Sequence, residues 1–285
     1  MKCIRTAVVG GLLALVLGAA SHAGAKEQRL IMGVFPGVEQ GQAEAYEIVD
    51  RFMPLAEYLT AKTGTKVLVL PVKIPARAMQ QMVEGTSIYK LFYGPPVFAS
   101  EAIEKAGFVP VVVEQERIQA VFVARADSRL QGLADFRDTT RVGMPPPKLL
   151  LAILANESLA QAKIALRPEA RQHIASADSI FVALDNGMVD VVVMRDRVVR
   201  KLMVDKPSAY RIVGKTVDAP GFTLIAHKSV EEAMRSRVRQ AALALNKDRS
   251  TQAIEVRANL RASPFVAGKD DEFQALQRMM ATWAR

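Results

Sequence analysis

The sequence is poor in residues that carry thiol, redox or metal chemistry. Its single cysteine is Cys3, and of its three histidines only His173 and His227 lie beyond the first 25 residues. Cys3 falls within an expected signal peptide, so the exported chain has no disulfide and no thiolate. The methionines at 79–82 and 188–194 are therefore expected to pack in the core rather than to bind a soft metal.

Sequence motifs of common enzyme classes are also missing. There is no GxSxG, HExxH, P-loop or GxGxxG pattern. His227 and Ser229 are expected to point to opposite faces of a strand, so we interpret them as structural. No Lys/Arg-rich block stands next to aromatic residues, which argues against a nucleic-acid partner. The sequence thus predicts no enzyme, no cofactor and no metal site.

The longest apolar run is too short to cross a membrane. Residues 6–20 are about 15 in number, against the roughly 20 that a spanning helix needs. Lys2 and Arg5 precede this run, and small residues follow it, which predicts a secretory signal cleaved near Ala23 or Ala25. We therefore expect a periplasmic protein, with an uncleaved anchor as the alternative.

Basic residues outnumber acidic ones. The chain has 38 Lys and Arg against 29 Asp and Glu, and loss of Lys2 and Arg5 with the signal leaves 36, a net charge of +7. Such an excess attracts anions or an anionic membrane surface, although an ordinary solvated surface explains it equally well. Segment 195–206 is expected to be a basic helix whose outer face is solvated or docks on a partner.

Apolar strands alternate with helices along the chain. Strands are expected at 29–36, 66–72, 89–96, 108–114, 119–128, 140–144, 189–194, 210–214 and 222–228, with 179–184 a further apolar element. Helices are expected at 44–62 (with a kink or restart at Pro54), 75–84, 96–105, from about 147, at 168–175, and at 230–246, 250–260 and 271–283. This alternation is typical of α/β folds with parallel-rich sheets covered on both faces.

The long strands at 119–125 and 222–227 are expected to be two crossover strands between two lobes. Residues 26–118 plus 223–285 then form lobe I, and residues 119–222 form an inserted lobe II. Two α/β lobes joined in this way make a hinge with a cleft, and ligands bind outside the carboxyl ends of the strands.

Six segments stand out along the chain: MGVFP (32–36), FMPLAEYLTAKTGTKV (52–67), FYGPPVFASEA (92–102), VARADSRLQGLADFRDTTRVGM (123–144), VALDNGMVDVVVM (182–194) and PGFTLIAHKS (220–229). In this order they resemble the periplasmic binding proteins of phosphate, phosphite and phosphonate ABC transporters. The resemblance covers nearly all of the exported chain. It implies a two-lobed α/β fold of the periplasmic-binding-protein (venus flytrap) kind. It also implies a small anionic ligand and delivery to an inner-membrane ABC permease, and we expect a monomer.

The resemblance also implies where the ligand lies, at loops that follow strand ends. The candidate ligand-binding residues are Phe35, Lys73, Arg77, Tyr93, Gly94, Lys148, Ser176, Asp178 and Arg195. Arginine offers a bidentate fork for planar oxyanions, and lysine offers a point charge. Solvated surface is the alternative for the three residues Lys73, Arg77 and Lys148. For Arg195 the alternative is an ion pair with Asp196 or Asp190.

The chain departs from the family pattern at these loops. Family members place small hydroxyl residues where this chain has PPPK (145–148). Three prolines remove three N–H donors, and only Pro147 is explained as a helix starter. The family's histidine falls at Ala177, its acidic residue at Arg195 and a common aspartate at Lys90. These departures favour a carboxylate or another oxyanion over a phosphonate amine.

Two functions follow from these patterns. The first is a periplasmic solute-binding protein of an ABC uptake system, which binds a phosphonate- or phosphate-family ligand or a rewired oxyanion or carboxylate. The alternative is a sensor or interaction module on the same fold that docks on a membrane partner without transport. The cationic residues favour the first function, and the prolines favour the second.

Overall fold

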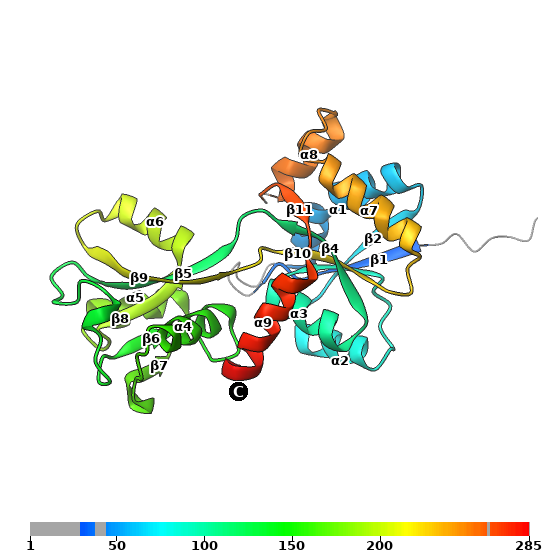
Figure 1. Cartoon of the computed structure of the whole chain (residues 1–285). Helices are drawn as coiled ribbons and strands as arrows, with labels where there is room; N and C mark the ends of the chain where they lie inside the picture. The colour runs from blue at the N-terminus through cyan, green and yellow to red at the C-terminus, as the bar shows by residue number, and fades with distance from the viewer. Residues whose placement is uncertain (1–28, 38–43, 261–262, 285) are drawn as a thin grey trace, which may run out of the picture.

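The protein has two lobes, each built on one β-sheet (Figure 1). The structure is a computed structural model that describes residues 29–37, 44–260 and 263–284. The expected signal peptide, with Cys3 and the cleavage positions Ala23 and Ala25, lies outside the described residues. Among the helices of the described part, none has the length and apolar character needed to span a membrane.

Lobe I contains a mixed sheet with the strand order β11-β4-β10-β3-β1-β2. Its strands are β1 (Arg29–Val34), β2 (Lys66–Pro71), β3 (Leu91–Gly94), β4 (Phe108–Glu114), β10 (Thr223–His227) and β11 (Phe265–Ala267). β1 is parallel to β2 and β3, whereas β10 is antiparallel to β3 and β4. Because β3 and β4 both oppose β10, the carboxyl ends of β1 to β4 lie at one edge of the sheet.

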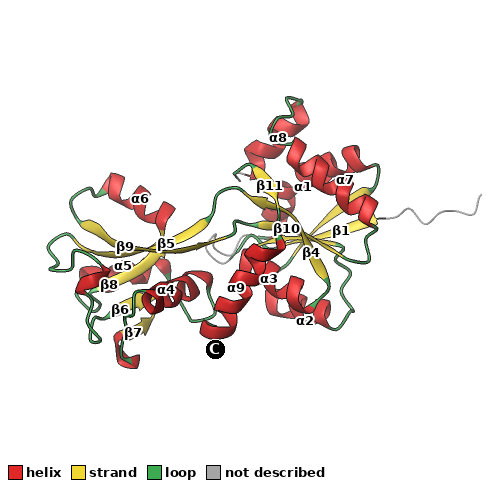
Figure 2. Ribbon diagram, in the orientation of Figure 1, coloured by secondary structure: helices red, strands yellow, loops and turns green. Residues whose placement is uncertain are grey.

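Helices cover both faces of this sheet (Figure 2). One face carries α1 (Ala45–Thr63), α7 (Glu232–Ala244) and α8 (Thr251–Leu260), and the other carries α2 (Pro75–Val83), α3 (Pro96–Lys105) and α9 (Asp270–Trp283). β1 shows the period of two that a strand requires, since Leu30, Met32 and Val34 all pack on the α1 side.

α1 runs without interruption from Ala45 to Thr63, with Pro54 inside it. The restart expected at Pro54 is therefore absent from this segment. The predicted stop at Gly64 is present, because Gly64 has φ 72° and its N–H donates to the carbonyl of Thr60. This left-handed position is one that glycine adopts without strain.

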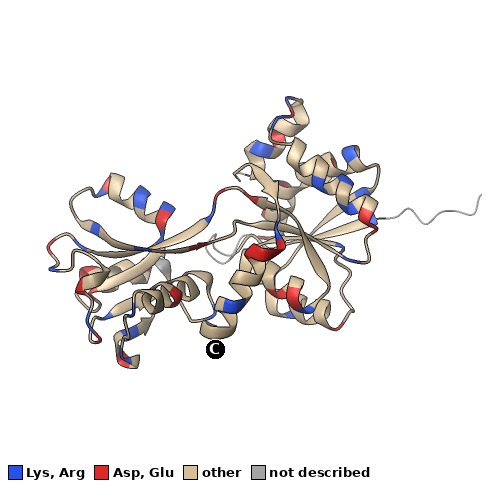
Figure 3. Cartoon of the chain, in the orientation of Figure 1, with Lys and Arg blue, Asp and Glu red and all other residues tan. Residues whose placement is uncertain are grey.

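Lobe II contains a sheet with the order β7-β6-β8-β5-β9. Its strands are β5 (Ile118–Arg125), β6 (Val142–Met144), β7 (Arg171–His173), β8 (Val191–Arg195) and β9 (Tyr210–Ala219). α4 (Leu150–Gln161) covers one face, and α5 (Ala177–Asp185) and α6 (Asp196–Asp205) cover the other. α6 carries several of the basic residues of this lobe (Figure 3) and buries only Val199 fully.

One expected element is wrong, the unassigned type of a second is now clear, and the start of a third differs from the expected position. Residues 168–175 are not a helix: a short 3₁₀ turn (Pro168–Ala170) leads into β7, which pairs in parallel with β6. The apolar segment 179–184 lies in helix α5, whose N-cap is Ser176. α4 begins at Leu150 rather than near 147, so Pro147 is not its first residue.

The chain passes between the lobes at 115–117 and at 220–222, just before β5 and β10 respectively. Gly221 lies where these crossing segments meet. A Cβ atom at Gly221 would be 2.6 Å from the carbonyl oxygens of Glu114 and of Glu116. Arg117 ion-pairs with Asp218 at 2.9 Å and with Glu272 of α9 at 2.7 Å. The crossing is thus tightly packed and tied to the last helix.

Candidate interlobe binding site

The carboxyl ends of the parallel strands define one edge of each sheet. In lobe I, β1, β2 and β3 end at Val34, Pro71 and Gly94, and in lobe II, β6, β7 and β8 end at Met144, His173 and Arg195. Arg195 pairs with Ala120 near the start of β5, so the lobe II edge lies beside the crossing. We call the loops that follow these six strands the interlobe site. Loops of this kind are where α/β proteins bind ligands.

A tyrosine–glutamate pair lies on the lobe I side of this site, with Tyr93 buried and Glu114 half-buried. The Tyr93 hydroxyl donates a hydrogen bond to the carboxylate of Glu114, the last residue of β4. The Tyr93 ring packs 5.1 Å from the Phe52 ring and 6.0 Å from the Phe222 ring. Burial, followed by the negative charge of Glu114, raises the pKa of Tyr93 well above its usual value. The phenol therefore remains a neutral donor.

Glu114 links the two lobes electrostatically. Burial raises its pKa above the ordinary value of a glutamate, against the hydrogen bond from Tyr93 and the positive charges of Arg195 and Arg51. Arg195 ends β8 in lobe II, so a charge of one lobe acts on a carboxyl group of the other. The two alternative partners of Arg195 are engaged elsewhere: Asp190 pairs with Arg141 at 2.6 Å and Asp196 with Arg200 at 2.5 Å.

Glu114 gives a pH prediction. Because its pKa is higher in the folded chain than in the unfolded chain, its contribution to stability is complete below the ordinary glutamate pKa and is lost as pH rises through the raised value. In Glu114→Gln the side chain cannot ionise, so stability is not lost in this way, and the amide oxygen still accepts a hydrogen bond from the Tyr93 hydroxyl. We expect the free energy of unfolding of the parent to fall, relative to that of the variant, as pH rises from 4 to 8.

Urea denaturation at each pH measures the free energy of unfolding of both proteins. Glu104→Gln, at an exposed position of α3, is the control. Parallel pH profiles for parent and Glu114→Gln would contradict the prediction.

Phe35 and Gly94 are held side by side next to this pair. The Phe35 N–H donates to the Tyr93 carbonyl at 3.0 Å, and the Phe35 ring lies 6.5 Å from that of Phe98 in α3. A Cβ atom at Gly94 would be 2.8 Å from the Phe92 ring and 3.3 Å from the Phe35 carbonyl oxygen. Glycine at position 94 thus permits close approach of two strand ends. Phe35, Tyr93 and Gly94 are brought together as one cluster.

The three prolines lie in the loop between β6 and α4, before the helix begins. The carbonyl of Pro146 accepts from the Leu149 N–H at 2.9 Å, and the carbonyl of Pro145 lies 2.9 Å from His173 Nδ1. The prolines therefore remove donors from the loop, not from the helix. α4 starts after them, and the N–H groups of Leu150 and Leu151 have no acceptor within the helix.

Ser176 and Asp178 occupy the start of α5. The Ser176 hydroxyl accepts from the Ser179 N–H at 3.5 Å and caps the helix. Asp178 lies in the first turn with an exposed side chain, where a carboxylate is stabilised by the helix dipole. Ser176 is thus engaged in a structural role, and Asp178 adds negative charge to this corner of the interlobe site.

Lys73, Arg77 and Lys148 are exposed, and none of them forms a hydrogen bond or ion pair with any residue that the structure describes. Lys73 follows β2, Arg77 is in the first turn of α2, and Lys148 precedes α4. These charges are available to an anion or to solvent. Lys90, which aligns with a family aspartate, lies instead at the amino end of β3, where its Nζ donates to Ser229 at 3.0 Å.

His227 and Ser229 do not point to opposite faces, and the expectation fails even for an extended strand, in which residues two apart share a face. The chain turns after β10, so the Ser229 hydroxyl lies 2.8 Å from His227 Nδ1, and the Ser229 N–H donates to the same nitrogen. Both residues sit at the amino end of β3, at the opposite end of that strand from Gly94. Within the described residues, no group of three or more His, Cys, Asp or Glu side chains could hold a metal ion.

Two residues of the site were missed at the level of sequence. Glu114 is a single acid at the end of the apolar run FVPVVV, and its place at a strand's carboxyl end was the available signal. Phe222 lies in the second crossing segment and packs against the cores of both lobes. Nothing in the sequence around Phe222 indicates this double contact.

The fold and the paired strand edges define a two-lobed binding protein, and comparison with known families identifies the class. The family model described as ABC transporter, phosphonate, periplasmic substrate-binding protein matches residues 41–273. The chain belongs to this family. It is a periplasmic solute-binding protein of the kind that acts with an ABC transporter, in a family of binding proteins rather than of enzymes. The sensor alternative is not favoured by these findings.

Solved structures show the same fold at low sequence identity. A binding protein component of an ABC phosphonate transporter from Pseudomonas aeruginosa is 15% identical, with 90% of this chain and 86% of that chain covered and a TM-score of 0.62. PhnD1 from Prochlorococcus marinus in complex with methylphosphonate is 14% identical, with 89% and 97% covered and a TM-score of 0.63. The periplasmic aliphatic sulphonate binding protein SsuA from Escherichia coli is 16% identical, with 90% and 91% covered and a TM-score of 0.57. No curated protein matches the sequence significantly.

Proposed function

We propose that the interlobe site binds a small organic anion, which lobe movement about the crossing segments encloses. The proposal is carried by one juxtaposition at the lobe II edge. β6 and β8 are neighbours in the sheet, so the start of α4 and Arg195 follow adjacent strands. Free N–H groups at a helix start and a guanidinium are both donors for oxyanions.

The ligand that we propose has a compact oxyanion and a short apolar part. Phe35 and the prolines 145–147 give the site apolar surface beside its cations. Methylphosphonate and aliphatic sulphonates, named for two structures of the same fold, have this composition. Arg195 stands where the family has an acid, which supports a carboxylate or other planar oxyanion over a ligand that carries an amine.

We further propose the route and the form in which the protein works. The chain is exported with cleavage near Ala23 or Ala25, acts as a monomer and delivers its ligand to an inner-membrane permease. Its two moving bodies are residues 26–118 plus 223–285 and residues 119–222. The mass of the protein recovered from the periplasm tests the cleavage, and light scattering tests the monomer.

A melting-temperature screen tests the ligand class. The chain from Lys26 is melted with phosphate, phosphite, methylphosphonate, methanesulfonate, sulfate, thiosulfate, acetate and succinate. A ligand at a hundred times its Kd adds about 2.7 kcal/mol, which raises the melting temperature of a protein of this size by roughly 5 to 10 °C. A carboxylate or other non-phosphorus oxyanion is expected to give the largest shift. A shift with none of the anions would overturn the proposal.

Variants then locate the site. Arg195→Met should weaken binding of the best anion by about tenfold or more, because a hydrogen bond to a charged group contributes about 1.5–3 kcal/mol. Lys206→Met, exposed after α6 and away from the strand ends, is the matched loss of charge and should leave the affinity unchanged. Equal effects of the two variants would point to a general effect of net charge rather than to the interlobe site.

A further inference from the structure

The last helix, α9, is anchored in lobe I. Phe273 and Leu276 are fully buried there. The Ser100 hydroxyl of α3 donates to the Phe273 carbonyl at 3.3 Å, and the Gln277 amide donates to the Ser100 carbonyl at 3.1 Å. These contacts fix both the position and the rotation of α9 on α3, so the helix must move together with lobe I.

The far end of α9 reaches lobe II (Figure 1). Nε1 of Trp283 donates to Oε2 of Glu157 in α4 at 2.8 Å. The other carboxylate oxygen of Glu157 accepts from the Gln161 amide at 2.9 Å, within α4 itself. The first turn of α9 is tied to the crossing by the ion pair of Glu272 with Arg117. α9 is thus a third connection between the lobes, besides the two crossing segments.

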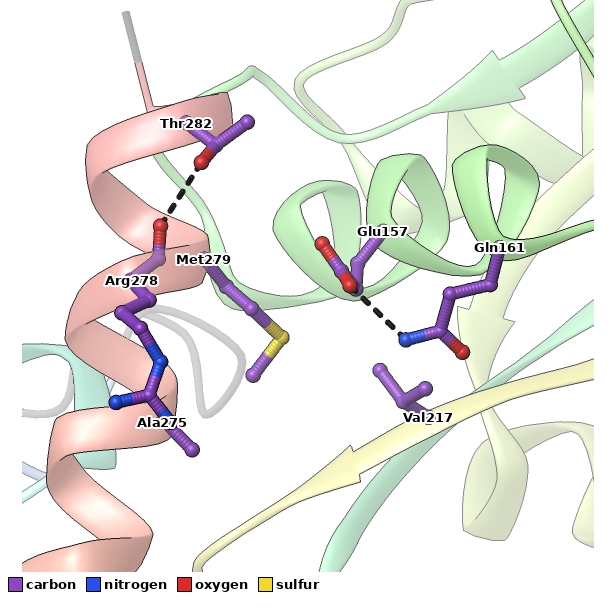
Figure 4. Close-up of a pocket in the computed structure, with 7 residues that line it drawn as sticks. All are labelled: Glu157, Gln161, Val217, Ala275, Arg278, Met279 and Thr282. Carbon is purple, nitrogen blue, oxygen red and sulfur yellow. Dashed lines mark hydrogen bonds between the residues drawn. The ribbon is translucent and has the colours of Figure 1, made fainter. Parts of the chain in front are cut away.

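A cavity of about 430 Å³ lies between this helix and lobe II (Figure 4). Glu157, Gln161 and Val217 line it from lobe II, and Met279 extends from α9 on the opposite side. The Glu157 carboxylate already accepts two hydrogen bonds, and the Thr282 hydroxyl donates to the Arg278 carbonyl at 3.0 Å. The Glu157 carboxylate and the Thr282 hydroxyl are thus already engaged within the protein.

We propose that the Trp283–Glu157 hydrogen bond sets the equilibrium between the present lobe arrangement and rotated ones. α9 moves with lobe I and α4 with lobe II, so a rotation about the crossing segments that separates α4 from α9 breaks the bond. Glu157 and Trp283 are then positioning residues for the interlobe site. A ligand that prefers a rotated arrangement gains affinity when the bond is removed, and one that prefers the present arrangement loses it. This effect on ligand affinity rests on the proposed function, whereas the shift in the equilibrium between lobe arrangements does not.

Distance measurements in the absence of ligand test the proposal. The chain from Lys26 has no native cysteine, so spin labels can be placed at cysteines introduced at exposed Glu104 in lobe I and exposed Glu169 in lobe II. Trp283→Phe and Glu157→Ala should each raise the population of a second interlobe distance at least about fivefold, the factor expected from the loss of one ordinary hydrogen bond and a lower bound for one that a carboxylate accepts. Pulsed dipolar spectroscopy measures both populations.

Two further variants separate the hydrogen bond from general damage. Glu157→Gln keeps an acceptor oxygen and should retain the parent distance distribution. Gln161→Ala removes only the bond within α4 and should also match the parent. The fluorescence of Trp283, the sole tryptophan, should become more accessible to acrylamide in Glu157→Ala and not in Gln161→Ala.

The outcomes are distinguishable from those of the ligand screen. Distance distributions of Trp283→Phe and Glu157→Ala that match the parent, in folded protein, overturn the proposal. So does a Glu157→Gln variant that behaves like Glu157→Ala. If the two variants broaden the interlobe distance distribution and the protein binds none of the anions, the connection through α9 is supported and only the proposed function is overturned.

Discussion

Replacing Gly221 by alanine is expected to destabilise the protein by about 3 kcal/mol, in the range of overpacked sites. The added Cβ would be 2.6 Å from two backbone oxygens, those of Glu114 and Glu116. A backbone oxygen cannot move aside as the end of a flexible side chain can, so the two crossing segments must separate. Urea denaturation measures the loss. Because these segments connect the lobes, the interlobe distance should change in the same variant.

Gly132→Ala is the matched control for this prediction. Gly132 has an extended backbone, with φ −162° and ψ 175°, and the nearest heavy atom to an added Cβ is 3.9 Å away. Its substitution should change the free energy of unfolding by no more than about 0.5 kcal/mol. If the two alanine variants are equally stable, the crossing segments are not as closely packed as the structure has them.

Phe92→Ala is expected to have the largest effect on stability, a loss of about 3–5 kcal/mol. The Phe92 ring stacks on Phe98 of α3 with centroids 4.2 Å apart, and it is fully buried. It also fills the space above Gly33 and Gly94, whose added Cβ atoms would be 2.7 and 2.8 Å from it. The melting temperature should fall by roughly 10 °C for a chain of this length.

Ile88→Ala is the control, since Ile88 precedes the same strand and its side chain is 54% exposed. It should change stability by less than about 0.5 kcal/mol. Because Gly94 opens the loop beside Phe35, a Phe92→Ala variant that remains folded should also bind the anion less well. Equal melting temperatures for the two variants would contradict the packing described for Phe92.

The order of helices and strands was predictable because most of them show a clear hydrophobic periodicity or end at a clear helix- or strand-breaking residue. β4 spans the expected residues 108–114, and the helix expected at 44–62 ends at Gly64 as expected. The apolar run 179–184 could not be assigned from its period, since a short buried run fits a strand or a helix. β7 has the polar sequence RQH and exists because it pairs with β6, which no local pattern reveals.

The residues of the site that lie at the end of a single strand could be predicted from the sequence. Those that depend on contacts between the two lobes could not. Phe35, Tyr93 and Gly94 follow or end adjacent strands and do cluster. The pairing of Tyr93 with Glu114, and the effect of Arg195 on Glu114, depend on tertiary contacts between distant segments. The sequence predicts a helix start at the three prolines, where only Pro147 suits the first helical position. In the structure Pro146 and Pro147 lie in the turn that the Leu149 N–H closes on the Pro146 carbonyl, and α4 starts only at Leu150.

The insertion of β10 between β3 and β4 has a consequence for how the chain acquires its structure. β3 and β4 are consecutive in sequence, yet the sheet of lobe I is complete only when Thr223–His227 enters between them. All strands of lobe II, by contrast, lie within one continuous stretch, 118–219. Long-range pairing of this kind is slow to form, and it leaves strand edges unpaired while it is pending. Lobe II can therefore finish folding first, and a chain that stops after Ala219 keeps every strand of lobe II but cannot close the sheet of lobe I.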